Sequence, residues 1–422
     1  MYKKTKLDNG LRVATCVIPA MQSVALGIWI KVGGRYESSD LKGIAHYLEH
    51  LVFKGTKNYS CRKLKESIEG VGGALNGFTS EELTCYLAKL PARHLDTALD
   101  ILSDMAVNPL LQECDIEKER TVILEEIKMY KDLPQSYVYD LLDNLLWPKQ
   151  PLGLSVIGTA ESVTKINSQD LASFKEFYYT PSNIVISAAG LLDHDKLIDK
   201  IGKKFDSREA KHTNNFAKAQ EEQDKPQLNV LLKETEQTHM ALGFHSFKRD
   251  DPLRHAISLL HIILGANMSS RLFNEVREKR GLAYEIGTLV KRFQDTGAFI
   301  VHAGMDNRKV TDAVKLILEE LEKIKYTLVS PGEFQRAKEF YLGQIMLALE
   351  DTLDHMLWIG ESQATIDKIY LLKDIIKEVN QLKRQDIRET AQRVFKKENL
   401  NLALIGPLKE AEGSIYKELI LN

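Results

Sequence analysis

Two histidines and a glutamate stand close together in residues 43–56, at a spacing that could bind a metal. His46, Glu49 and His50 occupy positions i, i+3 and i+4 in the order H-x-x-E-H, the reverse of the commoner H-E-x-x-H. Because an α-helix turns about 100° per residue, this spacing places all three side chains on one helix face. Two imidazoles one turn apart can bind one Zn²⁺ at about 2.0–2.1 Å each. Histidine pairs also occur as surface or core residues, so the motif needs a third ligand from elsewhere.

A second acidic helix, expected over residues 115–131, could supply that ligand. Its inward-facing stripe is predicted to contain Val122, Ile123, Ile127 and Tyr130. Glu119 and Glu126, seven residues apart, lie on this stripe, whereas Glu125 points away. Burying a carboxylate is costly unless a cation or a donor meets it, and a metal would do so. The alternative, that both acids form structural salt bridges, is the commoner case for such helices when they are considered alone.

Length, composition and charge limit the class of protein. A chain of 422 residues suits two domains of about 200 residues, and 44% hydrophobic with 27% charged residues is typical of a soluble globular protein. The net charge of -2 disfavours a nucleic-acid partner. No apolar run approaches the roughly 18 residues of a membrane span, and no signal peptide is recognisable. The scattered cysteines, Cys16, Cys61, Cys85 and Cys114, indicate reduced thiols and a cytoplasmic location.

The chain contains an internal duplication. Residues 24–28 match residues 240–244, and residues 183–190 match residues 399–406, both at an offset of 216. We therefore expect a first half over residues 1–206, a polar linker over 207–227 and a second half over 228–422. Each half should be α+β, with a mostly antiparallel sheet packed with helices.

The first half gives the clearest pattern of elements. Strands are predicted over 11–18, 23–32, 74–79, 82–90 and 184–189, the last closing the sheet, and helices over 60–69, 93–107, 115–131 and 137–146. Adding the offset of 216 to positions 46, 49 and 50 gives Ile262, Gly265 and Ala266 in the second half, at an apolar helix over 256–264. The second half therefore keeps the helix without the metal ligands, and we expect it to contribute to the shape of the protein or to substrate binding.

Three separated motifs together resemble one family. His46 to His50, the acidic stretch ending at Glu126, and residues 277–284 (REKRGLAY) are similar, in this order, to the pitrilysin (M16) zinc metallopeptidases, which are inverzincins. The similarity is strongest to the branch that includes the β subunit of mitochondrial processing peptidase and its bacterial relatives. It spans essentially the whole chain and implies two homologous halves that form a clamshell half-chamber.

The resemblance implies a role for each residue of the first two motifs. His46, His50 and Glu126 match the zinc ligands, and Glu49 matches the general base that activates water. Glu119 matches an acid that supports the site. The implied reaction is hydrolysis of peptides or unfolded segments by a metal-activated water, without a covalent intermediate, as expected for a zinc endopeptidase.

The resemblance also suggests how substrate binds. Arg277 and Tyr284 match an arginine and a tyrosine that reach from the second half to substrate carbonyls near the zinc. The substrate would be added as a strand between the halves, along residues 74–79, with Asn76 and Phe78 as contacts. Two alternatives remain open here: an ordinary packed pair for Arg277 and Tyr284, and an ordinary edge strand for residues 74–79.

The chain departs from the processing-peptidase pattern at the acids that read a substrate arginine. These acids stand ten and fourteen residues after the glutamate ligand, where this chain has Ser136 and Asp140. With only Asp140 present, a strict arginine requirement is in doubt. Because two repeats make half of the chamber found in larger relatives, the resemblance further suggests a homodimer or a heterodimer with a ligand-lacking paralogue.

Two other classes of function are compatible with the motifs. A catalytically silent scaffold or partner subunit of the same fold would usually lack part of the metal set, which is intact here. A structural zinc protein would normally close the metal with four protein ligands, and Glu49 is better placed as a base than as a fourth ligand. Metal content separates the silent subunit from the other two, and turnover separates the enzyme from the metal binder.

The expected role of Arg277 gives a first test. We expect Arg277→Ala to lower peptide turnover with zinc content unchanged, because the arginine would contact substrate and not the metal. Turnover and bound zinc are measured on the same preparation. Loss of zinc together with activity would contradict a substrate-binding role for Arg277.

Overall fold

The computed structural model describes residues 2–205, 215–408, 413 and 415. The chain forms two compact units. The first unit draws on Met1–Lys128, Leu154–Ala217 and Met346–Ile369, and the second on Met129–Gly153, Lys218–Ile345 and Tyr370–Asn422. Each unit therefore includes a segment from the opposite half of the sequence.

The first unit is built on a six-stranded sheet with the order β1-β2-β6-β3-β5-β4. Its strands are β1 (Tyr2–Lys6), β2 (Arg12–Val17), β3 (Ser23–Ile30), β4 (Ala74–Thr79), β5 (Thr84–Pro91) and β6 (Ile184–Gly190). Only the β2–β6 pair is parallel. Strand β6, expected to close the sheet, instead lies between β2 and β3, and β4 forms one edge.

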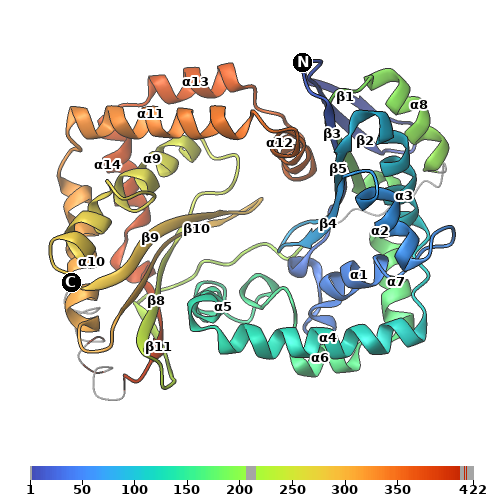
Figure 1. Cartoon of the computed structure of the whole chain (residues 1–422). Coiled ribbons are helices and arrows are strands. Elements are labelled where there is room, and N and C mark those ends of the chain that lie inside the picture. The colour runs from blue at the N-terminus through green and yellow to red at the C-terminus, as the bar shows by residue number, and fades with distance from the viewer. Residues whose placement is uncertain (1, 206–214, 409–412, 414, 416–422) are drawn as a thin grey trace. The chain divides into compact units, whose positions relative to one another are not determined.

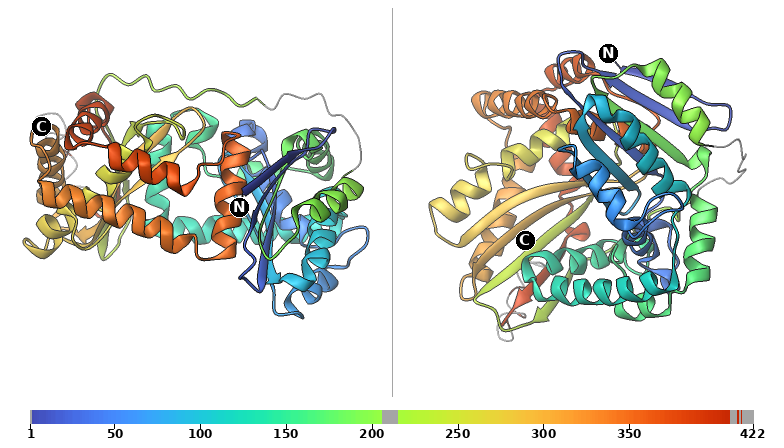
Figure 2. Two further views of the ribbon diagram at one scale, coloured as in Figure 1. Left: turned by 90° about the horizontal axis from the view of Figure 1, so that it is seen from above. Right: turned by 45° about the vertical axis from the view of Figure 1, so that its right-hand side comes forward.

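Helices cover one face of this sheet, as Figures 1 and 2 show. They include α1 (Ile44–Val52), α2 (Cys61–Glu69), α3 (Leu95–Val107), α7 (Ser168–Tyr178) and α8 (His194–Lys204). Alternate residues of the central strands, such as Leu26 and Ile28 on β3, are fully buried against them. Two further helices, α4 (Glu113–Asp132) and α6 (Ala160–Lys165), continue this part of the chain.

The opposite face of the first sheet is covered by α12 (Thr352–Thr365), which comes from the second half of the sequence. Helix α12 packs on β2, β3 and β6 (Figure 1). Gly360 allows the close approach, because a Cβ at this position would lie 2.1 Å from Nε1 of Trp29. The Trp29 indole N–H donates to Ser187 Oγ at 2.8 Å, so the polar group of this buried tryptophan has a partner.

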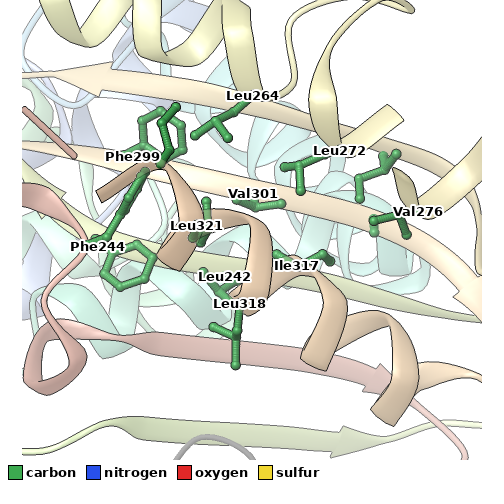
Figure 3. Packing of buried hydrophobic residues seen from close by; sticks show 14 of the residues in the cluster. Leu242, Phe244, Leu264, Leu272, Val276, Phe299, Val301, Ile317, Leu318 and Leu321 are labelled. Atoms are coloured by element: carbon green, nitrogen blue, oxygen red, sulfur yellow. The ribbon is translucent and has the colours of Figure 1, made fainter. Parts of the chain in front are cut away.

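The second unit repeats this arrangement with five strands in the order β7-β11-β8-β10-β9. They are β7 (Gln227–Leu232), β8 (Gln237–Ser246), β9 (Ala283–Arg292), β10 (Gly297–Asp306) and β11 (Asn401–Gly406). The second half of the sequence supplies this unit with the helices α9 (Arg254–Leu264), α10 (Val310–Tyr326), α11 (Pro331–Ala348), α13 (Leu372–Gln381) and α14 (Arg384–Val394). Figure 3 shows the core, in which Leu242 and Phe244 of β8 meet Leu318 and Leu321 of α10. Helix α5 (Pro134–Leu146), from the first half, packs on β8 and β11.

The two sheets share one topology, which supports the duplication. Strands β2, β6, β3, β5 and β4 correspond in order and direction to β7, β11, β8, β10 and β9. The register differs by two residues, because Val24 pairs with Gly190 whereas Met240 pairs with Leu404. A displacement of two residues keeps each side chain on its own face of the sheet, so the core pattern survives.

Two further predictions concern the linker between the halves and the absence of a membrane-spanning helix. Residues 207–214 lie outside the described residues, and residues 215–226 form neither helix nor strand. The expected boundaries of the two halves remain a prediction, since the compact units exchange segments across them. Within the described residues, no helix has the length and apolar character needed to cross a membrane.

Packing at Gly360 can be tested by adding one methyl group. We expect Gly360→Ala to lower the free energy of unfolding by about 1–3 kcal/mol, because the Cβ overpacks against Trp29. The matched control is Gly343→Ala in α11, where a Cβ meets nothing within 4 Å; it should be neutral or stabilising by up to about 1 kcal/mol. Urea unfolding of both variants provides the measurement. Equal stabilities would show that α12 does not pack tightly on Trp29.

Candidate metal centre

The metal-type helix α1 begins at a glycine that no other residue could replace without strain. Gly43 has a φ of 94°, in the left-handed region, and a Cβ there would lie 2.8 Å from the carbonyl oxygen of Ile157. The following residues, from Ile44 to Val52, form the helix that carries His46, Glu49 and His50.

A buried carboxylate six residues earlier holds the first turn of α1. Glu37 accepts hydrogen bonds from the backbone N–H groups of Gly43 at 2.9 Å and Ala45 at 2.8 Å. Lys42 lies 3.4 Å from the same carboxylate. Burial raises the pKa of Glu37, and Lys42 and the two N–H groups oppose that rise. No motif in the sequence indicated Glu37, because its two hydrogen bonds to α1 are to backbone N–H groups.

The structure brings together the three residues expected to bind metal, His46, His50 and Glu126. Nε2 of His46 lies 3.8 Å from Oε2 of Glu126, and Nε2 of His50 lies 3.6 Å from the same oxygen. All three ligand atoms lie within 4.8 Å of one another. Two imidazole nitrogens and one carboxylate oxygen are a donor set that suits Zn²⁺ and leaves a fourth position open.

Both histidines can present an unprotonated nitrogen to a metal. Burial and the neighbouring His50 lower the pKa of His46 to about 3, so its ring is neutral at physiological pH. Nδ1 of His46 is buried with no hydrogen-bond partner among the described residues. We assign the proton of His50 to Nδ1, which then donates to Oε2 of Glu119 at 3.1 Å. Nε2 of His50 is left free for the metal.

Glu119 is the buried acid of α4, as expected, and it has two partners. Its carboxylate contacts His50 through Oε2 and Lys54 Nζ through Oε1, the latter at 2.6 Å. An acid that orients a ligand histidine in this way typically raises the basicity of the ligand. The prediction that Val122 faces inward is wrong: it is 48% exposed, because the buried face of α4 is centred on Glu119, Ile123 and Ile127.

Glu49 lies on the same helix face and is largely buried. Burial raises the pKa of Glu49, whereas a hydrogen bond from Thr79 opposes the rise. The Thr79 hydroxyl donates to Oε2 of Glu49 at 2.6 Å. Thr79 is the last residue of β4 and was missed as a site residue, because no spacing rule relates it to the helix motif.

The two residues expected to contact substrate on β4 point away from the helices that carry the metal site. Asn76 is exposed, and its Oδ1 accepts a hydrogen bond from the N–H of Gly77 at 2.9 Å. Phe78 is 36% exposed and makes an edge-on contact with Trp29, with ring centroids 5.8 Å apart. Both lie on the edge strand of the sheet, so their contact with substrate stays a prediction.

The remaining expected residues belong to the second unit. Arg277 lies on a π-helical segment, Phe273–Glu278, and its guanidinium lies 5.8 Å from the ring centroid of Tyr284 on β9. Tyr284 is 74% exposed. Asp140 lies on α5, where burial and then the charge of Asp140 raise the pKa of Tyr137. The structure thus places Arg277 beside Tyr284, and the roles of all three residues in substrate binding stay predictions.

Comparison with known proteins agrees with this site. Residues 12–160 match the family model described as Insulinase (Peptidase family M16), and residues 165–341 match the Peptidase M16 inactive domain. A zinc protease of Bacillus subtilis, described as uncharacterized, is 36% identical over 96% of this chain and 98% of its own length. This chain belongs to the M16 peptidase family. Like the M16 family in general, it has Zn²⁺ as its cofactor.

Other M16 relatives extend the similarity. A zinc protease of Streptomyces coelicolor, also described as uncharacterized, is 35% identical over 98% of this chain and 91% of its own length. The crystal structure of a protease from Helicobacter pylori superimposes with a TM-score of 0.91 at 25% identity, covering 96% of this chain and 99% of that one. The inactive-domain match starts at residue 165 and includes α9, the helix to which the sequence offset of 216 carries the first histidine position, as Ile262.

The contact between Glu119 and His50 predicts a change in metal affinity. We expect Glu119→Gln to weaken zinc binding by about 10–100-fold, because the His50 ring loses its charged acceptor. The matched control is Glu125→Gln on the same helix, since Glu125 is exposed and pairs with Lys128. Competition with a chromophoric chelator measures both affinities. Equal affinities for the two variants would exclude a supporting role for Glu119.

Proposed function

We propose that the chain is a zinc-dependent endopeptidase that hydrolyses peptides or unfolded protein segments. The observation that carries this proposal is the convergence of His46, His50 and Glu126, with Glu49 on the same face of α1. Among the described residues the metal-type cluster contains three ligands and not four, which favours a catalytic over a structural zinc.

The residues around the site support a general-base mechanism. Zinc would supply Lewis-acid polarisation of the scissile carbonyl and acidify a water. Glu49 would take a proton from that water and later give it to the leaving amine. Burial raises the pKa of Glu49 above its ordinary value. His46, His50 and Glu126 would hold the metal, and Glu119 would keep the His50 ring in place.

We further propose that substrate binds as a strand added to β4. Strand β4 pairs with β5 on one side and forms the edge of the sheet on the other. Main-chain hydrogen bonds at such an edge give affinity with little dependence on sequence. Asn76 and Phe78 would contact the added strand. Arg277 and Tyr284 would contribute donors to substrate carbonyls, and Asp140 would favour a basic side chain.

Assembly and location complete the proposal. A homodimer, or a heterodimer with a ligand-lacking paralogue, would complete the chamber that the family resemblance implies. A cytoplasmic location is supported by the cysteines, all four of which are free thiols.

The assigned base and ligands make a direct prediction. Glu49→Gln should keep zinc and lose peptide cleavage, because the amide cannot accept the proton. His50→Ala or Glu126→Ala should lose both zinc and cleavage. Zinc content and cleavage of a quenched peptide library are measured on each variant, with Glu125→Gln as the control. Cleavage by the Glu49→Gln protein would rule out Glu49 as the base.

Substrate preference requires a separate measurement. Cleavage sites should be mapped on a proteome-derived peptide pool, with and without a chelator. Chelator-sensitive cleavage with a basic residue near the cut would support the role of Asp140, whereas cleavage without a basic preference would contradict it.

A further inference from the structure

The hydrogen bond between Thr79 and Glu49 connects the edge strand to the helix that carries the metal ligands. Residues of β4 alternate between the two faces of the sheet, and Leu75, Gly77 and Thr79 face the helices. The Thr79 hydroxyl is the group of this strand that reaches Glu49, at 2.6 Å from Oε2. This distance is in the range of a strong hydrogen bond from a hydroxyl to a carboxylate.

A second contact fixes β4 against the same helix. Gly77 lies against the ring of Phe53, the residue that ends α1, and a Cβ at Gly77 would lie 3.0 Å from that ring. Gly77 and Thr79 thus contact α1 near its end and at Glu49. Because both are on one strand, the position of the β4 backbone and the position of the Glu49 carboxylate are set together.

The hydrogen bond also makes the two oxygens of the Glu49 carboxylate unequal. Oε2 accepts from Thr79, whereas Oε1 receives no hydrogen bond from the residues that the structure describes. A carboxylate has lone pairs on both oxygens, and an oxygen that already accepts a strong hydrogen bond is the weaker proton acceptor of the two.

We propose that Thr79 is a positioning residue for the general base: its hydroxyl holds Oε2 of Glu49, so that Oε1 accepts the proton of the attacking water. This inference rests on the proposed peptidase function. In the reaction, the O–H bond of water breaks, its proton moves to Oε1, and the hydroxide oxygen bonds to the peptide carbonyl carbon. The proton then leaves Oε1 for the amine nitrogen as the peptide C–N bond breaks.

The same bond relates substrate binding to catalysis. A substrate strand paired with the free edge of β4 takes its register from the β4 backbone. Since Thr79 belongs to that backbone, the register of the added strand and the direction of the Glu49 carboxylate are coupled through one side chain.

The test compares three variants of the full chain with the wild type. Thr79→Val removes the hydroxyl and keeps the shape and the β-branch, Thr79→Ser keeps the hydroxyl, and Ser80→Ala removes a neighbouring hydroxyl that bonds Leu83 instead of Glu49. We expect Thr79→Val to lower kcat by about 10–100-fold, with KM and zinc content unchanged, because a hydrogen bond to a charged group is lost. Thr79→Ser should stay within about threefold of wild type, and Ser80→Ala should match wild type.

Two outcomes would overturn the proposal while leaving the peptidase function intact. One is a kcat for Thr79→Val within twofold of an active wild type. The other is a loss of zinc or of stability in Thr79→Val that Thr79→Ser does not restore, which would indicate a structural role. If Thr79→Val does not fold, Thr79→Ala is measured in its place against the same criteria. A wild-type protein without chelator-sensitive cleavage would instead refute the proposed function itself.

Discussion

The approach of the Glu126 carboxylate to the imidazoles of His46 and His50 is the interaction on which the rest of the site depends. Three donor atoms on two helices, 76 residues apart in the chain at His50 and Glu126, converge within 4.8 Å. A half-buried carboxylate facing two imidazole rings gains little without a cation. The arrangement therefore favours a bound metal, and burial lowers the pKa of His46.

The surrounding residues limit the freedom of this centre. Glu37 holds the first turn of α1, and Glu119 holds the ring of His50. Thr79 holds the carboxylate of Glu49 from the edge strand. Each contact joins α1 to a different segment of the first unit, so the helix is held at its first turn, at His50 and at Glu49. Such fixed geometry is what a catalytic site needs, because small displacements of reacting groups cost much of the rate.

The duplication explains why the chain has two similar units. Both sheets have the same strand order, and the cluster of two histidines and a glutamate found among the described residues lies in the first unit. Each sheet is covered on one face by its own helices and on the other by a helix from the opposite half of the sequence, α12 in the first unit and α5 in the second. Because of this exchange each unit contains residues from both halves of the chain, which accounts for the difference between the compact units and the expected halves.

The sequence by itself determined the local features of this protein. Helical spacing placed His46, Glu49 and His50 on one face, and an extended stretch after several glycines predicted β4 with its observed bounds. Two sequence matches at an offset of 216 predicted two similar halves, and the three motifs together predicted the M16 family. These features depend on the 3.6-residue and 2-residue periods of helix and strand, which are readable from the order of residues.

Only the tertiary structure decided which distant groups meet. Thr79 and Glu49 are 30 residues apart, Glu37 bonds backbone groups, and Trp29 packs beneath Gly360 of a helix from the other half. The exposure of Val122 likewise depended on where α4 lies against its neighbours. Periodicity defines the faces of an element but not its partners, because partners are set by packing between segments that are remote in the chain.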